Sequence, residues 1–174
     1  MRRPIRCLLG SVLAVVLLFS LLTSCKSEPL SPDQIRLDFT CDAAVTVEDS
    51  EIGCTFSHTA QGVGYVLVTV PEQLAGVCFE WMGDAYCISY NGLKCETDKP
   101  FLPNSSFATA LMNVLEGAAD TDALTRETSD GGVTVFSGDS RSGLFRISVD
   151  NASGYIVELS VDALKLRAEL TNHK

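Results

Sequence analysis

Few residues in this sequence are of the types that perform chemistry, and they do not cluster. Of its 174 residues only two are histidines, His58 and His173. A metal site needs several histidine, cysteine or carboxylate ligands at close spacing. The sequence has no Cys-x-x-Cys pair, and its carboxylates are scattered. His58 follows the apolar parity of Cys54 and Phe56, so we interpret it as an inward-facing side chain. The sequence predicts no metal site and no cofactor.

A serine nucleophile is the other chemistry to weigh. Ser140 follows Gly138 and Asp139, and as a nucleophile it would need His58 as its base together with a fixed carboxylate. No pattern supports that arrangement, and the polar run around Ser140 is typical of a hairpin loop. Phosphate-binding glycine motifs are also absent from the sequence. We therefore expect a protein that is not an enzyme.

Cysteine is the one residue type with an unusual count, at seven. Five of the seven belong to the main body of the chain: Cys41, Cys54, Cys78, Cys87 and Cys95. Because five is odd, at least one of these thiols lacks a partner within the chain. If Met82-Gly83 forms a two-residue turn, Cys78 and Cys87 lie opposite each other and can form a disulfide. If Gly83-Asp84 forms the turn instead, the register changes and they cannot.

The N-terminus has the pattern of a targeting segment. Three arginines precede an apolar stretch from Cys7 to Leu22, shorter than the ~20 residues that a resident membrane helix needs. A basic start and a short apolar core are typical of a secretory signal peptide. The stretch ends in Leu22-Thr23-Ser24-Cys25, which resembles the lipobox of bacterial lipoproteins. In that family the cysteine receives diacylglycerol and becomes the first residue of the mature chain.

The lipobox resemblance implies a signal peptide over residues 1–24 and a lipid on Cys25. The body would then be extracytoplasmic and anchored to a bacterial membrane, since each buried methylene of an acyl chain contributes ~0.8 kcal/mol. Residues 25–34 contain two prolines and several charges, which predicts an extended tether. The alternatives are an uncleaved anchor, or an ordinary signal peptide with a chance cysteine.

The rest of the chain is acidic. The first 24 residues contain three of the 13 Lys and Arg and none of the 22 Asp and Glu, which leaves 22 acidic residues against 10 basic ones. A protein with that charge repels the phosphates of nucleic acids. We therefore expect no nucleic-acid partner, and the sequence names no protein partner.

Hydrophobic periodicity predicts a run of strands interrupted once. From Ile35 to Val47 apolar and polar residues alternate, which is typical of a half-buried strand. Similar segments recur to Leu170 and give ten or eleven strands, separated by turn signals such as Asn91-Gly92. Between Phe107 and Ala118 apolar residues instead recur at three and four positions. That spacing predicts one helix, capped by Asn104 or Ser105.

The proportions of sheet and helix constrain the architecture. Eleven strands ~4.8 Å apart span ~50 Å, whereas a helix of ~13 residues is ~20 Å long and ~10 Å across. The apolar face that the helix leaves uncovered must be buried by curling of the sheet, by a second layer or by an apolar guest. We expect residues 35–174 to form one α+β, mainly β domain: a strongly curled antiparallel half-barrel with one plugging helix.

This order of elements, with a lipobox before it and the turn Asp150-Asn151-Ala152-Ser153-Gly154 near its end, resembles the LolA/LppX-like half-barrel superfamily. That family includes lipoprotein carriers and lipid-binding lipoproteins of the bacterial envelope. The resemblance implies a concave hydrophobic face and transfers no specific binding residue. Two hypotheses follow. One is noncatalytic binding of a lipid or other hydrophobic ligand in a concave β cavity. The other is a structural or protein-interaction module of the envelope, with a core filled by its own side chains.

Overall fold

The computed structural model describes residues 28–98 and 106–174, and the strands in these residues form a single eleven-stranded sheet. The elements in chain order are β1 (Phe39–Val47), β2 (Ser50–Ala60), β3 (Val63–Val70), β4 (Cys78–Met82), β5 (Ala85–Tyr90), β6 (Leu93–Asp98), α2 (Phe107–Ala118), β7 (Thr125–Asp130), β8 (Val133–Ser140), β9 (Gly143–Asp150), β10 (Ile156–Val161) and β11 (Leu166–Thr171).

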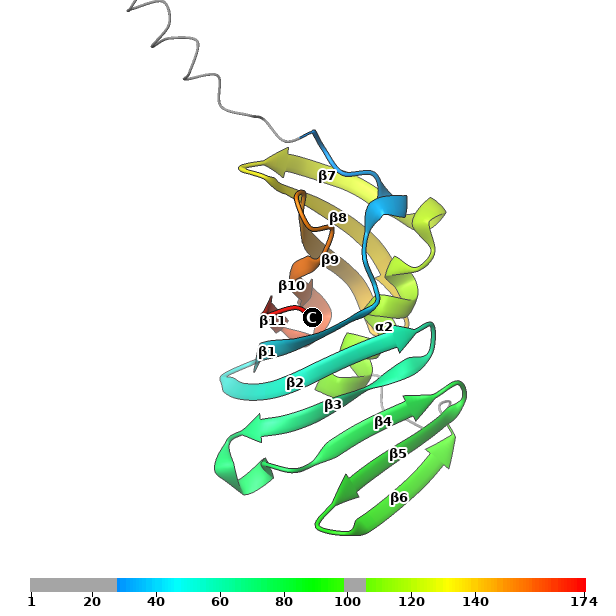
Figure 1. Cartoon of the computed structure of the whole chain (residues 1–174), viewed down its shortest axis with the longest axis vertical. Coiled ribbons are helices and arrows are strands. Elements are labelled where there is room, and N and C mark those ends of the chain that lie inside the picture. The colour runs from blue at the N-terminus through cyan, green and yellow to red at the C-terminus, as the bar shows by residue number, and fades with distance from the viewer. Residues whose placement is uncertain (1–27, 99–105) are drawn as a thin grey trace, which may run out of the picture.

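The sheet consists of two antiparallel meanders joined in the middle (Figure 1). The first meander runs outward from β1 through β2–β5 to β6 at one edge. The second starts at the other edge with β7 and returns through β8–β10 to β11. The two meet where β1 pairs antiparallel with β11, with Val45 opposite Ala168. The sheet is not closed, because β6 and β7 each pair with a single neighbour in the described residues.

Helix α2 plugs the inner face of this sheet. Its N-cap is Ser106, one residue beyond the predicted caps, and the hydroxyl of Ser106 accepts a hydrogen bond from the backbone N–H of Thr109 at 3.2 Å. Nine of the twelve helix residues are buried. A helix surrounded on most sides by apolar atoms is a core element rather than a surface element. The predicted half-barrel with one plugging helix is therefore confirmed.

Helix α2 contacts both meanders. At its start, the ring of Phe107 packs edge-on against Phe79 of β4, with ring centroids 5.4 Å apart. Near its end, Gly117 lies so close to the second meander that a Cβ there would be 2.8 Å from the carbonyl oxygen of Asp139 and 2.7 Å from the Phe145 ring. Only glycine permits this approach. The helix thus connects the two meanders across the hollow of the sheet.

The core is continuous from one meander to the other. Its largest fully buried side chains come from β2, β8, β9, β10 and α2 alike, and they include Phe56, Phe136, Phe145, Leu111, Leu115, Ile147 and Leu159. Cys41 and Cys54 are also buried in it. The inner face over β1 and β8–β11 is therefore filled by the chain's own side chains.

Two strand boundaries differ from the sequence-based expectation. β1 begins at Phe39, and among the described residues before it, 28–38, only Arg36 forms a β-bridge, with Tyr155. β8 continues through Gly138 to Ser140, so the segment predicted to be a loop is strand. The physical reason lies across the sheet: Gly138 is opposite Phe145, and a Cβ on residue 138 would be 2.6 Å from that ring. The glycine that suggests a loop is needed here to seat an aromatic side chain.

The described part of the predicted tether is held on the body. Leu30 is 6% exposed and belongs to the core, and its backbone N–H donates to the hydroxyl of Thr134 at 3.1 Å. Pro32–Gln34 then form a single turn of 3-10 helix with a capping box at Ser31. Residues 30–34 therefore pack on the body, whereas the sequence predicted an extended tether as far as residue 34.

Candidate functional site: a cleft on the face opposite α2

Strand register separates the side chains of β2–β6 into two faces. One row crosses five strands directly, with members Ser57, Tyr65, Glu80, Cys87 and Glu96. The adjacent row contains Trp81 and Tyr86, which are each 2% exposed. Tyr86 is hydrogen-bonded through its side chain to Thr109 of α2, so this second row faces the helix. Because successive residues of a strand alternate, the first row points away from α2.

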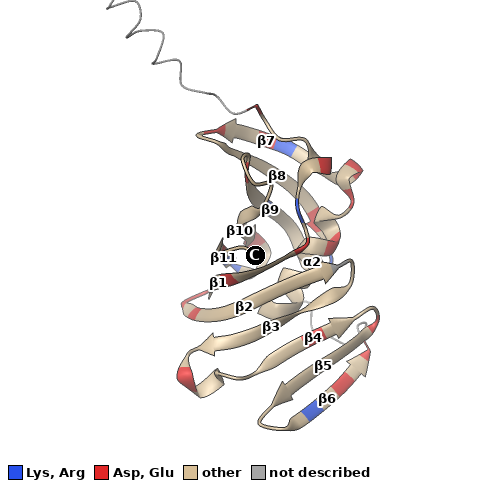
Figure 2. Cartoon of the chain, in the orientation of Figure 1, with Lys and Arg blue, Asp and Glu red and all other residues tan. Residues whose placement is uncertain are grey.

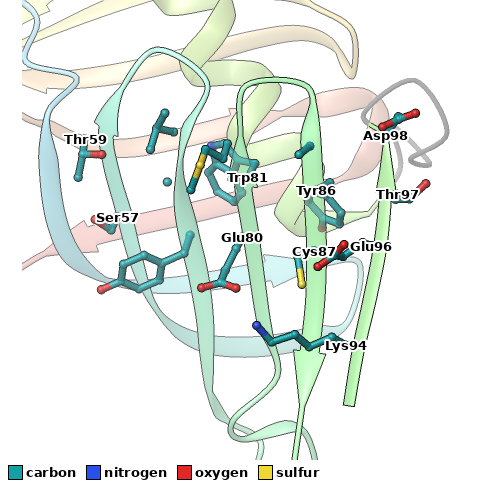
Figure 3. A pocket seen from close by; sticks show the side chains of 15 residues that line it. Ser57, Thr59, Glu80, Trp81, Tyr86, Cys87, Lys94, Glu96, Thr97 and Asp98 are labelled. Atoms are coloured by element: carbon teal, nitrogen blue, oxygen red, sulfur yellow. The ribbon is translucent and has the colours of Figure 1, made fainter. Parts of the chain in front are cut away.

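A cleft of about 740 Å³ lies on the face that points away from α2 (Figure 3). Tyr65, Glu80, Cys87, Lys94 and Glu96 line it with their side chains. Its volume falls within the roughly 300–1,000 Å³ of typical small-molecule sites. The cleft thus lies on the face of the sheet opposite α2. From the sequence we expected a cavity on the concave face, which α2 covers.

A buried aromatic layer lies between the cleft and α2, and its residues Trp81 and Tyr86 also border the cleft. Trp81 packs against Phe56 with ring centroids 6.3 Å apart, and Tyr86 packs against Phe79 at 6.5 Å. Burial raises the pKa of Tyr86 to about 12, so its phenol is neutral at physiological pH. Within the described residues the buried indole N–H of Trp81 has no hydrogen-bond partner. The strands beneath the cleft are therefore held in place by packing.

The lining combines apolar surface with an excess of negative charge. Tyr65 and Met82 supply apolar area, and Met82 is 74% exposed. The carboxylates of Glu80, Glu96 and Asp98 outnumber the single cation of Lys94. Next to this row, burial raises the pKa of Cys78, and the charges of Glu80 and Cys87 raise it further. Such a surface suits an amphiphile with an apolar tail and a neutral or cationic head.

Of the residues selected from the sequence, Cys25 lies outside the described residues. The Cys78–Cys87 disulfide does not form in the structure, where both thiols are free. Met82 is opposite Ala85, so Gly83-Asp84 makes the two-residue turn. Cys78 consequently lies opposite Ser89, and Cys87 lies opposite Glu80. The structure therefore adopts the register that excludes the bridge.

His58 and Ser140, the residues weighed above for catalysis, have structural roles instead. His58 is 4% exposed, its Nδ1 is hydrogen-bonded with the carbonyl oxygen of Leu37, and burial lowers its pKa. The hydroxyl of Ser140 donates to the carbonyl oxygen of Gly143 at 2.9 Å and accepts from the backbone N–H of Ser142 at 3.2 Å. These bonds close the turn between β8 and β9. Across residues 28–98 and 106–174 no three His, Cys, Asp or Glu residues group as metal ligands.

Sequence reasoning missed the cleft, although one signal pointed toward it. The segment from Tyr65 to Val70 is apolar on both faces of the predicted strand. In a sheet packed on one face only, apolar residues on the other face indicate a second contact surface. Tyr65 of that segment lines the cleft.

In the described part of the chain no helix is long and apolar enough to span a membrane.

No known family model matches the chain, and no curated protein matches it. Solved structures of similar shape do. One is the LolA superfamily protein NE2245 from Nitrosomonas europaea, at 12% identity and a TM-score of 0.47, covering 83% of this chain and 89% of that one. Another is the lipoprotein LppX from Mycobacterium tuberculosis, at 13% identity and a TM-score of 0.41, covering 82% and 87%. At such identities the similarity concerns the half-barrel architecture alone.

Proposed function

We propose that this chain is a noncatalytic bacterial lipoprotein, anchored by a lipid on Cys25 after removal of residues 1–24, whose body binds a lipid or other amphiphile outside the cytoplasm. The observation that supports ligand binding is the cleft of about 740 Å³ on β2–β6. The anchor is supported by the basic start, the apolar stretch and Leu22-Thr23-Ser24-Cys25.

The geometry of the cleft favours a ligand with one apolar part and one polar part. The row from Ser57 to Glu96 crosses five strands, so the cleft follows a path of about four strand spacings, or ~19 Å. The Tyr65 ring and the Met82 side chain offer contact for an apolar tail, and Glu80 and Glu96 offer acceptors for a polar head. Small-molecule sites typically combine apolar surface with polar groups that fix the orientation of the ligand.

A titration of the body with a fluorescent monoacylglycerol, which has an apolar tail and a neutral head, tests this function. The core extends from Leu30 to Leu170, so a protein that starts at residue 26 retains every core residue. We expect saturable binding, and we expect Cys87→Trp to abolish it because an indole on that strand would occupy the middle of the cleft. Leu144→Trp is the matched control, since Leu144 is 73% exposed and lies outside the cleft lining. Absence of binding, or equal loss in both variants, would contradict the proposal.

A second candidate function is a structural or protein-interaction module of the cell envelope. The observation that favours it is the filled interior, where α2 buries nine of its twelve residues against the sheet. If this function is correct, the body purified from cells carries no lipid in native mass spectrometry and does not bind the fluorescent monoacylglycerol. Lipid recovered with the wild-type body, but not with Cys87→Trp, would favour the first candidate.

A further inference from the structure

We propose that two copies of this chain pair through β6, antiparallel and centred on Cys95, so that their two sheets become continuous. β6 lies at the end of the strand order and pairs with β5 alone in the described residues. Five of its six residues are exposed. A regular edge strand with unpaired backbone groups is a template for a further strand.

The hairpin geometry determines which backbone groups of β6 are available. Tyr90 and Leu93 flank the two-residue turn Asn91-Gly92, whose φ values of 50° and 82° are those of a type I′ turn. Such a turn makes Tyr90 and Leu93 a hydrogen-bonded pair, and the pairs alternate along an antiparallel ladder. The N–H and C=O groups of Leu93, Cys95 and Thr97 therefore point to β5. Those of Lys94, Glu96 and Asp98 point to the open edge.

Charge along β6 selects one register for a second copy. Figure 2 shows both signs of charge on this strand, with the basic residue toward its start and acidic residues further along. With Cys95 opposite Cys95 of the second copy, Lys94 lies opposite Glu96 of that copy, and the reverse pair forms by symmetry. Shifting the centre to position 94 places Lys94 opposite itself, and shifting it to position 96 places Glu96 opposite itself while Lys94 faces Asp98. Like charges directly opposite each other are unfavourable. Of these three registers, only the one centred on Cys95 pairs opposite charges without also pairing like charges.

The same register agrees with the hydrogen-bond pattern. Lys94 and Glu96 both direct their backbone groups to the open edge, so they form the hydrogen-bonded pairs of the new ladder. Cys95 then occupies a non-hydrogen-bonded pair, where Cα atoms lie about 4.5 Å apart. That spacing falls within the roughly 4.4–6.8 Å range of disulfides. Both copies would present their clefts on one face of the joined sheet, because opposite residues of an antiparallel pair share a face.

The other edge of the sheet is less suitable. β7 departs from regular pairing with β8 between Arg126 and Thr128, where the register shifts. Irregularities of this kind twist an edge away from further pairing. β6 keeps an uninterrupted register with β5 over all six residues. The comparison of the two edges therefore points to β6 as the contact surface.

Charge exchange tests the pairing on the full chain in detergent solution. Sedimentation of the wild type should show a dimer. Lys94→Glu should raise the dimer dissociation constant about tenfold or more, because a carboxylate at position 94 would face Glu96 of the second copy twice in each dimer. The double variant Lys94→Glu/Glu96→Lys should restore wild-type affinity, because the pairs are then reversed but intact. A monomeric wild type, or a double variant no tighter than the single one, would overturn the proposal.

Disulfide trapping tests the register independently. Oxidised glutathione should link two Cys95 thiols, which lose two protons and two electrons while one glutathione disulfide is reduced to two thiols. The linked dimer should be absent in Cys95→Ser and unchanged in Cys78→Ser. A matched control carries Leu144→Cys in the Cys95→Ser background, which places an exposed thiol away from the sheet edge. Cross-linking that is no faster in the wild type than in this control would contradict the register. If the monoacylglycerol titration fails while trapping succeeds, the pairing stands without the proposed function.

Discussion

Two parts of one sheet differ sharply in how they are stabilised. In the covered sheet, which we define as β1 and β8–β11, the buried and exposed residues alternate, as in β11 from Leu166 to Thr171. In the wing, which we define as β4–β6, exposure increases toward the edge until β6 is exposed at five of six positions. Helix α2 reaches the wing through Phe107 but packs along β8 for much of its length. The comparison indicates that the covered sheet supplies stability, while the wing presents surfaces for contact.

Truncation of a buried side chain should produce the largest difference in stability between the core and the wing. Leu111 of α2 is fully buried, so Leu111→Ala should lower the free energy of unfolding by about 3–5 kcal/mol through lost contacts and a residual cavity. Leu93 in the wing is 76% exposed, and Leu93→Ala should change it by less than about 0.5 kcal/mol. Urea unfolding of the body measures both. Equal losses would mean that the wing contributes to the core as much as the covered sheet.

A substitution where α2 approaches the second meander should have an intermediate effect on stability. Gly117→Ala improves helix propensity by about 1 kcal/mol, but its Cβ would lie 2.8 Å from the Asp139 carbonyl oxygen and 2.7 Å from the Phe145 ring. Overpacking against backbone costs about 1–3 kcal/mol, so we expect a net loss of stability. Thermal unfolding of the variant checks this. A rise in the melting temperature would mean that α2 has room to move away from β8.

The smallest effect should come from protonation of a buried histidine at the centre of the sheet. Burial lowers the pKa of His58 below its usual value of 6.5, so the unfolded chain binds a proton at a higher pH than the folded chain does. The free energy of unfolding should therefore fall as the pH drops below 6.5 and stop falling below the folded-state pKa. In His58→Asn, whose amide can still donate to Leu37, this part of the pH dependence should vanish. An identical pH profile in both proteins would exclude His58 as its source.

The elements of this fold were predictable because they depend on local pattern. Alternation of the kind seen from Phe39 to Val47 needs only one buried face, and the spacing from Phe107 to Ala118 needs only one buried stripe. The end of β8 was not predictable in this way. Gly138 belongs to a strand because Phe145 requires space across the sheet, and that requirement is visible only in three dimensions.

The candidate site was less predictable than the fold. The two registers considered for the β4–β5 hairpin differ by the position of one turn, and local sequence did not distinguish them. That choice decides whether Cys87 faces Cys78 or Glu80. The cleft itself depends on the side chains of five strands coming into one row, from Ser57 to Glu96. No short segment of the sequence contains that row, although the two apolar faces of the strand from Tyr65 to Val70 were a partial signal.

Thiol protection tests most directly where the ligand binds. Cys87 lines the cleft, whereas Cys95 is exposed and lies opposite Ile88 on the same face of the sheet as Tyr86, the face toward α2. Maleimide labelling of the body, followed by mass spectrometry of each cysteine, reports on both faces of the wing in one sample. We predict that saturating monopalmitoylglycerol, an amphiphile with a neutral head, slows labelling of Cys87 and leaves that of Cys95 unchanged. Labelling of Cys87 that is unaffected by monopalmitoylglycerol, or slowing of Cys95 alone, would contradict a site on the face opposite α2.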